Sequence, residues 1–288
     1  MDNLLYYPYI NLPDTDWTVR ALLYYDNIGT IVPAQYFYEP EHYEPFMREV
    51  VQNELVALID PMGVLEHSFE ISEVFCNYLN RYGNVLKRRV TSFQNLRRDC
   101  VHRERSLDRM NRSRLHVDKL DAEIFYNLTQ MGLAERIDDY WYEVESKTAG
   151  ELMTFLTSVV ANKIDFQPAT DRIDQGFATA YIRNQDIELR TRQYKRDLIL
   201  KNLIPYPKQI DLDNLRRFKD RHHDLLRAFR NRVEELVLNS AIIPESPQFV
   251  NAIDNMKMAK EELVARMNES HIGDIVLSLI HISEPTRH

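Results

Sequence analysis

Three short apolar runs, separated by helical patterns, occupy the first sixty residues. The runs cover residues 4–10, 28–33 and 55–59 and consist mainly of Leu, Ile, Val and Tyr. Residues 14–26 and 45–53 lie between them and are expected to form helices. Strand-length runs that alternate with helices are typical of a parallel sheet. We therefore predict a β-α-β-α-β opening with buried strands and right-handed connections.

The middle of the chain extends this pattern. A helix is predicted over 66–82, and further strands are predicted over 114–117 and 140–144. Residues 165–176 include Pro168 and are expected to form a loop. The fold class that follows is mixed α/β and helix-rich, with a mainly parallel sheet of about four or five strands.

Two helices in this region have recognisable end signals. Asp118 is expected to begin a helix that ends at Gly132, because Asp favours the N-cap and Gly the position after the last turn. Thr148 and Glu151 have the spacing of a capping box. A stripe of apolar residues that starts at Leu152 follows at helical intervals.

The last third of the chain is predicted to be helical. Helices are expected over 186–203, 212–239 and 248–268, and prolines separate them. The apolar residues of the middle helix repeat at alternating intervals of three and four, as in a coiled coil. Two long helices around a proline-rich turn predict a helical hairpin. The predicted organisation is an α/β domain over 1–165 and a helical region over 166–276.

The end of the chain has an unusual sequence. Residues 277–287 resemble the translated read-through of a transposon-based sequencing adaptor. We therefore expect 277–288 to be a non-native tail and the chain to be a truncated fragment. The alternative is a genuine edge strand over 275–282.

Charge is unevenly distributed along the chain. The net charge is −8, yet the segment 81–114 holds eleven Lys and Arg against three Asp and Glu. Such a segment is a candidate nucleic-acid surface, with Arg97, Arg98, Arg103 and Arg105 as its contact residues. The favoured interpretation is a solvated helical face that pairs with the acidic part of the same chain, because neither aromatic interleaving nor a nucleic-acid motif accompanies the charge.

Several protein classes are disfavoured by what the sequence lacks. It has no apolar run of about 18 residues and no signal-peptide pattern, and it has only two cysteines, Cys76 and Cys100. A cytoplasmic location without membrane contact is the resulting prediction. There is no phosphate-binding glycine loop, nucleophile elbow or Cys/His metal pattern, so no cofactor or metal is identifiable.

Candidates for chemistry lie where strands are expected to end. His116 and Lys119 lie at a predicted strand-to-helix junction, where His can act as acid, base or ligand and Lys can hold a phosphate. The bland alternative, which we favour, makes Asp118 a helix cap and Lys119 a surface residue.

Carboxylates form the second group of candidates. Asp14 and Asp16 follow the first strand, Asp60 follows the third, and Asp171 follows the Pro168 turn. Carboxylates at neighbouring strand ends can hold Mg²⁺. Caps and turns are the alternative role for each of them.

Several short stretches carry a family resemblance. They are Leu5-Tyr6-Tyr7-Pro8, Trp17, Tyr25-Asp26, Ile31-Val32-Pro33, Ile59-Asp60-Pro61, Leu115-His116-Val117-Asp118-Lys119-Leu120, Gly132-Leu133-Ala134, Trp141, Pro168-Ala169-Thr170-Asp171 and Ile204-Pro205-Tyr206-Pro207. Taken in order, they resemble an uncharacterised bacterial family, domain of unknown function family 6236. The resemblance covers most of residues 4–240, and no activity is implied by it.

Three functional hypotheses follow, and whether the chain is an enzyme stays open. The first is a regulatory or interaction protein, in a defence-type system, that meets a protein partner or a second copy through helix 212–239 and exposes an apolar strip there. The second is an enzyme on a phosphate-containing or nucleotide substrate, with Asp14, Asp60, His116 and Lys119 in one pocket. The third is nucleic-acid binding through 81–114, which we do not favour.

Overall fold

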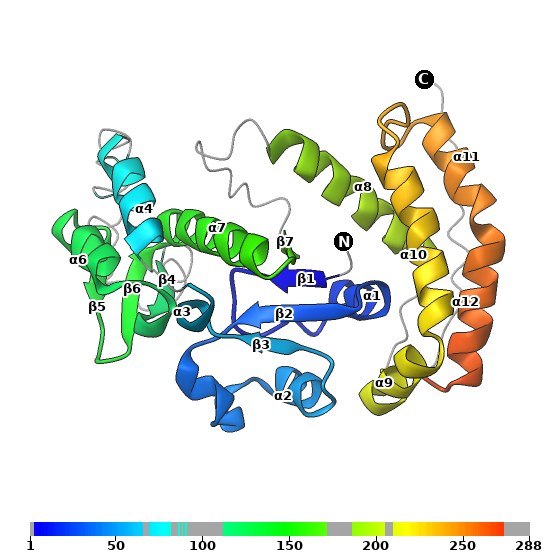
Figure 1. The fold of residues 1–288 in the computed structure, drawn as a ribbon, viewed down its shortest axis with the longest axis horizontal. Coiled ribbons are helices and arrows are strands. Elements are labelled where there is room, and N and C mark those ends of the chain that lie inside the picture. Colours follow the sequence, from blue (N-terminus) through cyan, green and yellow to red (C-terminus); the bar gives the residue numbers. More distant parts are fainter. Residues whose placement is uncertain are drawn as a thin grey trace, which may run out of the picture. The chain divides into compact units, whose positions relative to one another are not determined.

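The chain folds as a mixed α/β protein, as predicted, in a computed structural model that describes residues 3–65, 69–81, 86, 88, 90, 112–171, 186–204 and 210–273. Its contacts divide it into two compact units. The first unit comprises 1–13 and 25–187, and the second comprises 14–24 and 188–288. The predicted boundary after residue 165 therefore falls inside the first unit. Figure 1 labels the elements along the chain.

The first unit contains a four-stranded parallel sheet (Figure 1). Its strands are β1 (Asn3–Tyr6), β2 (Asn27–Ile31), β3 (Ala57–Ile59) and β7 (Gln167–Ala169), in the order β3-β2-β1-β7. Every pair is parallel, which confirms the predicted β-α-β-α-β opening. A Cβ on Gly29 would lie only 3.1 Å from the Phe166 ring and 3.2 Å from Leu5, so glycine permits the close packing on β2.

Two predictions about this sheet are wrong. Strand β7 lies where a loop was expected, and it contains Pro168. Proline is tolerated there because β7 is an edge strand, with β1 as its neighbour in the sheet. Strand β3 is the other edge and is only partly buried, whereas its continuous apolar run predicted a buried strand.

A second, antiparallel sheet lies in the same unit. It pairs β4 (Arg112–His116), β6 (Trp141–Glu145) and β5 (Ala134–Arg136) in the order β4-β6-β5. The strands predicted over 114–117 and 140–144 therefore exist but do not extend the parallel sheet. His116 is paired with Trp141 in this register.

Helices pack around both sheets. The first unit holds three 3₁₀ turns and five α-helices: η1 (Ala34–Phe37), η2 (Pro40–His42), η3 (Val117–Lys119), α2 (Pro45–Gln52), α3 (Pro61–Val64), α4 (Phe69–Arg81), α6 (Ala122–Gln130) and α7 (Ser146–Lys163) among the described residues. Helix α7 contributes Leu152, Leu156 and Val160, each with no exposed surface, to the core. Burying such side chains is the main favourable contribution to stability.

Cap residues differ from those predicted. Asp121, not Asp118, caps α6 by accepting the Glu123 N–H, and Gly132 has the expected positive φ of 75° after it. Glu145, not Thr148, caps α7 by accepting two backbone N–H groups. Glu151 is buried inside α7 and accepts a 2.7 Å hydrogen bond from the Tyr78 hydroxyl instead of closing a capping box.

The second unit is helical. It contains α1 (Asp16–Tyr24), α8 (Asp186–Leu203, from Glu188 onward), α9 (Leu212–Arg221), α10 (His223–Leu238), α11 (Pro247–Asn255) and α12 (Lys257–Glu269). Two helices predicted to be continuous are each interrupted, at His222 and at Met256. His222 has φ −112° and ψ 26°, outside helical geometry, so the coiled-coil-like stripe spans two helices.

The apolar stripe of α9 and α10 is covered by the chain itself. Its buried members are Leu212, Leu215, Phe218, Leu226, Phe229, Val233, Leu236 and Val237. The exposed apolar strip that the interaction hypothesis required over 212–239 is therefore not present.

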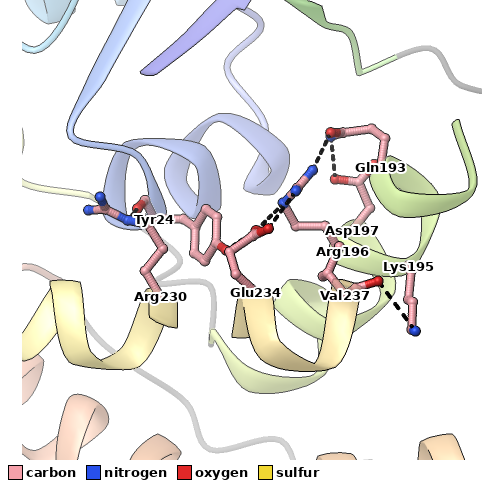
Figure 2. A network of polar contacts seen from close by, with 8 residues as sticks. All are labelled: Tyr24, Gln193, Lys195, Arg196, Asp197, Arg230, Glu234 and Val237. Atoms are coloured by element: carbon pink, nitrogen blue, oxygen red, sulfur yellow. Dashed lines mark hydrogen bonds and ion pairs between the residues drawn. The ribbon is translucent and has the colours of Figure 1, made fainter. Parts of the chain in front are cut away.

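A polar network joins α1, α8 and α10 inside this unit (Figure 2). The Glu234 carboxylate accepts hydrogen bonds from Arg196 Nε (2.6 Å) and Nη2 (2.9 Å) and from the Tyr24 hydroxyl (2.6 Å). Arg230 Nε donates to the Tyr24 carbonyl oxygen at 2.8 Å. Lys195 Nζ donates to the Asn239 carbonyl (2.7 Å), where it satisfies the end of α10.

Candidate functional site

A pocket of about 440 Å³ opens at the carboxyl end of the parallel sheet, entirely within the first unit. Tyr6, the last residue of β1, and Asp171, two residues beyond β7, both line it. The carboxyl ends of strands are the usual place for ligands in open α/β sheets. The volume is within the range of small-molecule sites. The lining also includes Tyr9, Tyr36, Glu44, Arg114, Lys119 and Trp141, together with the segment 10–13.

Lys119 is the most unusual side chain of the pocket. It is 3% exposed, and burial lowers the pKa of its amine to about 7. No described residue accepts a hydrogen bond from this amine or forms an ion pair with it. A large fraction of the amine is therefore uncharged at neutral pH, with its lone pair available.

His116 fixes the turn that carries Lys119. Its Nδ1 accepts a 3.2 Å hydrogen bond from the Asp118 backbone N–H, and its Nε2 lies 3.0 Å from the Gln35 side-chain amide nitrogen. Burial lowers the pKa of His116, and the opposing charge of Asp118 compensates only in part. A neutral imidazole without exposed surface is suited to positioning the turn rather than to meeting a ligand.

The His116 imidazole also packs against two aromatic side chains of the pocket, Trp141 and Tyr36. Its ring packs edge-on against Trp141 with centroids 4.9 Å apart, and against Tyr36 at 6.5 Å. Trp141 and Tyr36 both line the pocket. His116 therefore connects the second sheet, through β4, to the aromatic side chains that a ligand would contact.

Tyr6 and Asp171 form the polar side of the pocket. The Tyr6 hydroxyl donates a 3.0 Å hydrogen bond to Asp171 Oδ1, and Tyr6 is 1% exposed. The bond keeps the phenol at the end of β1 in a fixed orientation. Such a tyrosine–carboxylate pair can donate or relay a proton.

Two charged residues stand at the exposed part of the lining. Arg114 is exposed and forms no ion pair with another described residue, although Glu143 is its register partner on β6. Glu44 is also exposed, and its backbone N–H donates to Asn11 Oδ1 at 3.2 Å, which ties the chain after β1 to the start of α2. Arg114 thus provides a second positive charge for an anion that reaches Lys119.

The structure brings together some of the residues that the sequence singled out. Lys119 and Asp171 line the pocket, and His116 lies behind it. Asp60 does not line it, because its carboxylate accepts the Met62 N–H at 3.0 Å and caps α3. Asp14 belongs to the second unit. The expectation that Lys119 is a surface residue is wrong.

Sequence reasoning did not select Tyr6, Tyr36, Arg114 or Trp141 as site residues. One signal could have identified Tyr6: it is the last residue of a strand in a parallel sheet, and ligands usually bind at that end of such strands. Tyrosines on a strand were interpreted as core, and Tyr6 is indeed buried while one side of it lines the pocket.

The predicted Mg²⁺ ligands have other roles. Asp16 forms an ion pair with Arg20 one turn later in α1, and Asp60 is a cap. In the described ranges, no cluster of three or more His, Cys, Asp or Glu side chains is arranged to hold a metal ion. The described helices also include none with the length and apolar character needed to cross a membrane.

Two predictions concern residues outside the described ranges. They are the nucleic-acid contacts Arg97, Arg98, Arg103 and Arg105 and the tail over 277–288.

Comparison with known proteins finds no match for this chain among protein-family models, curated proteins or solved structures. The resemblance to family 6236 stays a prediction. The pocket is therefore the structural basis for inferring a function.

Proposed function

We propose that the first unit is an enzyme domain that binds a small phosphate-containing molecule in this pocket. The observation that carries the proposal is the Lys119 amine, which is buried, has no counter-charge among the described residues and lines a 440 Å³ cavity. An unpaired buried lysine is unfavourable for folding, because desolvation opposes its charge. Such groups concentrate at functional sites, where a ligand supplies the missing partner.

The other lining residues support an anionic ligand with an aromatic or similarly flat part. Lys119 and Arg114 provide two cationic groups, and phosphate oxygens are good acceptors for both. Trp141 and Tyr36 provide aromatic surface. This combination suits a nucleotide or another phosphate ester better than a neutral apolar compound.

Binding has an electrostatic consequence. A phosphate beside Lys119 favours the charged amine and raises its pKa from about 7. Ligand binding near pH 8 is therefore accompanied by proton uptake, and affinity falls as pH rises above 7. A binding site built on permanently charged surface lysines would not show this dependence.

The competing hypotheses lack an equivalent observation. Leu215 and Val233, in the centre of the stripe over 212–239, have no exposed surface, so a protein partner would have to meet the polar side of those helices. Nucleic-acid binding through 81–114 stays a prediction.

The test is a binding titration that is monitored by calorimetry and by tryptophan fluorescence, since Trp141 lines the pocket. Inorganic phosphate, pyrophosphate and AMP are the probes. Lys119→Met replaces the amine with an apolar chain of similar length, and we expect at least about a tenfold loss of affinity. The matched control is Lys163→Met, at an exposed lysine of the same unit. Equal affinity in the wild type and Lys119→Met, or no binding by either, would overturn the proposal.

A further inference from the structure

The pocket contains the components for covalent chemistry as well as binding. A phosphate-anchoring lysine needs only a positive charge, which an exposed or ion-paired lysine retains. Lys119 is instead buried without an acceptor or a carboxylate partner among the described residues. Withdrawing an amine from water without a counter-charge is one of the ways in which proteins make a lysine nucleophilic.

We propose that Lys119 is a nucleophile that condenses with the carbonyl group of an anionic aldehyde or ketone to form an imine. The inference rests on the proposed function, because the anionic group of the same molecule is what the pocket would bind. It goes further by giving the substrate a second group, a carbonyl carbon that reaches Lys119 Nζ while the anion faces Arg114.

The reaction is a condensation that needs no oxidant or other co-reactant. The lone pair of the neutral Nζ attacks the carbonyl carbon, the C=O π pair moves to oxygen, and a proton passes from nitrogen to that oxygen to give a carbinolamine. The nitrogen lone pair then forms the C=N bond while the C–O bond breaks. Oxygen leaves as water with both protons that the amine has lost, so atoms and electrons balance.

Proton transfer to the leaving oxygen requires a general acid in the same pocket. Tyr6 lines the pocket, and its hydroxyl is held at 3.0 Å by Asp171 Oδ1. The phenol can deliver its proton to the carbinolamine oxygen and recover one from the iminium nitrogen through the site. Asp171 acts through Tyr6 and is a positioning residue in this scheme.

The experiment traps the imine by reduction. Pyridoxal 5′-phosphate, which carries an aldehyde and a phosphate, is incubated with the full chain in the presence of cyanoborohydride, and labelled lysines are identified by peptide mass spectrometry. We expect saturable labelling at Lys119, at least tenfold faster than at the exposed Lys147 and Lys163. Excess inorganic phosphate should slow labelling at Lys119 and leave the two exposed lysines unaffected.

Variants separate chemistry from binding. Lys119→Met should lose the fast adduct, and Lys163→Met should retain it. Tyr6→Phe should slow imine formation at Lys119 by at least tenfold at saturating pyridoxal 5′-phosphate, where a change in affinity no longer affects the rate, because the general acid is removed. Unchanged rates in Tyr6→Phe would refute the role of Tyr6.

Failure of this inference is distinguishable from failure of the proposed function. If phosphate binds and Lys119 is labelled no faster than Lys163, the nucleophile inference is refuted and the binding proposal stands. If phosphate does not bind and Lys119 is not preferentially labelled, both are refuted. Fast labelling that phosphate does not slow would support the nucleophile and refute a phosphate site.

Discussion

Tyr6 and Asp171 are separated by 165 residues and joined by a 3.0 Å hydrogen bond between the phenol and the carboxylate. The bond connects the end of β1 to the turn after β7, the two strands that pair in parallel at that side of the sheet. The pocket therefore depends on the pairing of two strands that lie far apart in the sequence. The hydrogen bond between Tyr6 and Asp171 can form only when β1 and β7 are paired.

The first prediction concerns this contact. Tyr6→Phe removes the donor and leaves Asp171 partly accessible to water, so we expect a loss of about 1 kcal/mol in the free energy of unfolding. Urea denaturation followed by circular dichroism measures it. A loss above about 3 kcal/mol would mean that the phenol supports the core and not only the pocket.

Removing the Lys119 amine should stabilise the protein. The pKa of this amine is about 7 in the folded chain, against an ordinary value of 10.5, so the unfolded chain holds the proton more tightly. The buried amine therefore lowers the free energy of unfolding of the wild type by its full amount below pH 7, and this loss disappears as pH rises toward 10.5. Lys119→Met should be more stable by up to about 4 kcal/mol at pH 6, with a smaller gain at pH 9.

Thermal unfolding at both pH values provides the measurement for Lys119→Met. Lys163→Met is the control, because this lysine is exposed, and its stability difference from the wild type should be near zero. A destabilised Lys119→Met would show that the amine has a structural partner.

The contribution of Asp197 to stability depends on pH in the opposite direction to that of Lys119. Its Oδ2 has no hydrogen-bond partner, and burial raises its pKa to about 7 despite the opposing charges of Arg196 and Arg20 and a 3.3 Å hydrogen bond from Gln193. The folded chain holds this proton more tightly than the unfolded chain, where the value is 3.8. The contribution to stability is thus largest below pH 4 and is lost as pH rises to 7.

Asp197→Asn should remove that loss. We expect the variant to gain up to about 4 kcal/mol over the wild type at pH 8 and little at pH 4. Unfolding free energies across this window test it, with Asp254→Asn, at an exposed position of α11, as the control. Parallel pH profiles for the wild type and Asp197→Asn would contradict the assignment.

The fourth prediction concerns Glu234, which accepts both Arg196 nitrogens and the Tyr24 hydroxyl. Burial raises its pKa, but the hydrogen bond and charge of Arg196 outweigh burial and leave it lowered. Its stabilising effect is therefore present above the ordinary value of 4.5 and is lost as pH falls. Glu234→Ala removes the carboxylate that accepts two hydrogen bonds from the buried Arg196 guanidinium and should destabilise by about 3 kcal/mol.

A double-mutant cycle isolates the ion pair. Arg196→Met combined with Glu234→Ala should cost less than the sum of the two single changes, because each single change already removes the interaction between the two side chains. Additive effects would show that the two groups contribute independently.

The sequence was a good guide to elements with long apolar patterns and a poor guide to short or interrupted ones. The runs at 28–33 and 55–59 correctly predicted two parallel strands, β2, which pairs with β1, and β3, which pairs with β2. Strand β7 has only three residues and includes Pro168, so neither length nor propensity identified it. The stripe over 212–239 continues through His222, because a break of one residue hardly changes the spacing of apolar positions.

The candidate site was only partly predictable for the same reason. Asp171 was predicted as a candidate beside a proline turn. Its contact with Tyr6 could not be predicted, because it depends on the pairing of β1 with β7, and the sequence did not predict β7. Lys119 was assigned to the surface because Asp118 was taken as the helix cap. The true cap, Asp121, leaves room for the η3 turn that buries Lys119.

The membership of α1 in the second unit has a consequence for synthesis of the chain on the ribosome. Helix α1 emerges early, yet Glu234 and Arg230, which hold Tyr24, are translated about two hundred residues later. Until then the apolar side of α1, with Leu22 and Leu23, lacks the helices of its own unit. A nascent chain paused before residue 230 is therefore a natural client for a chaperone that shields short apolar helices.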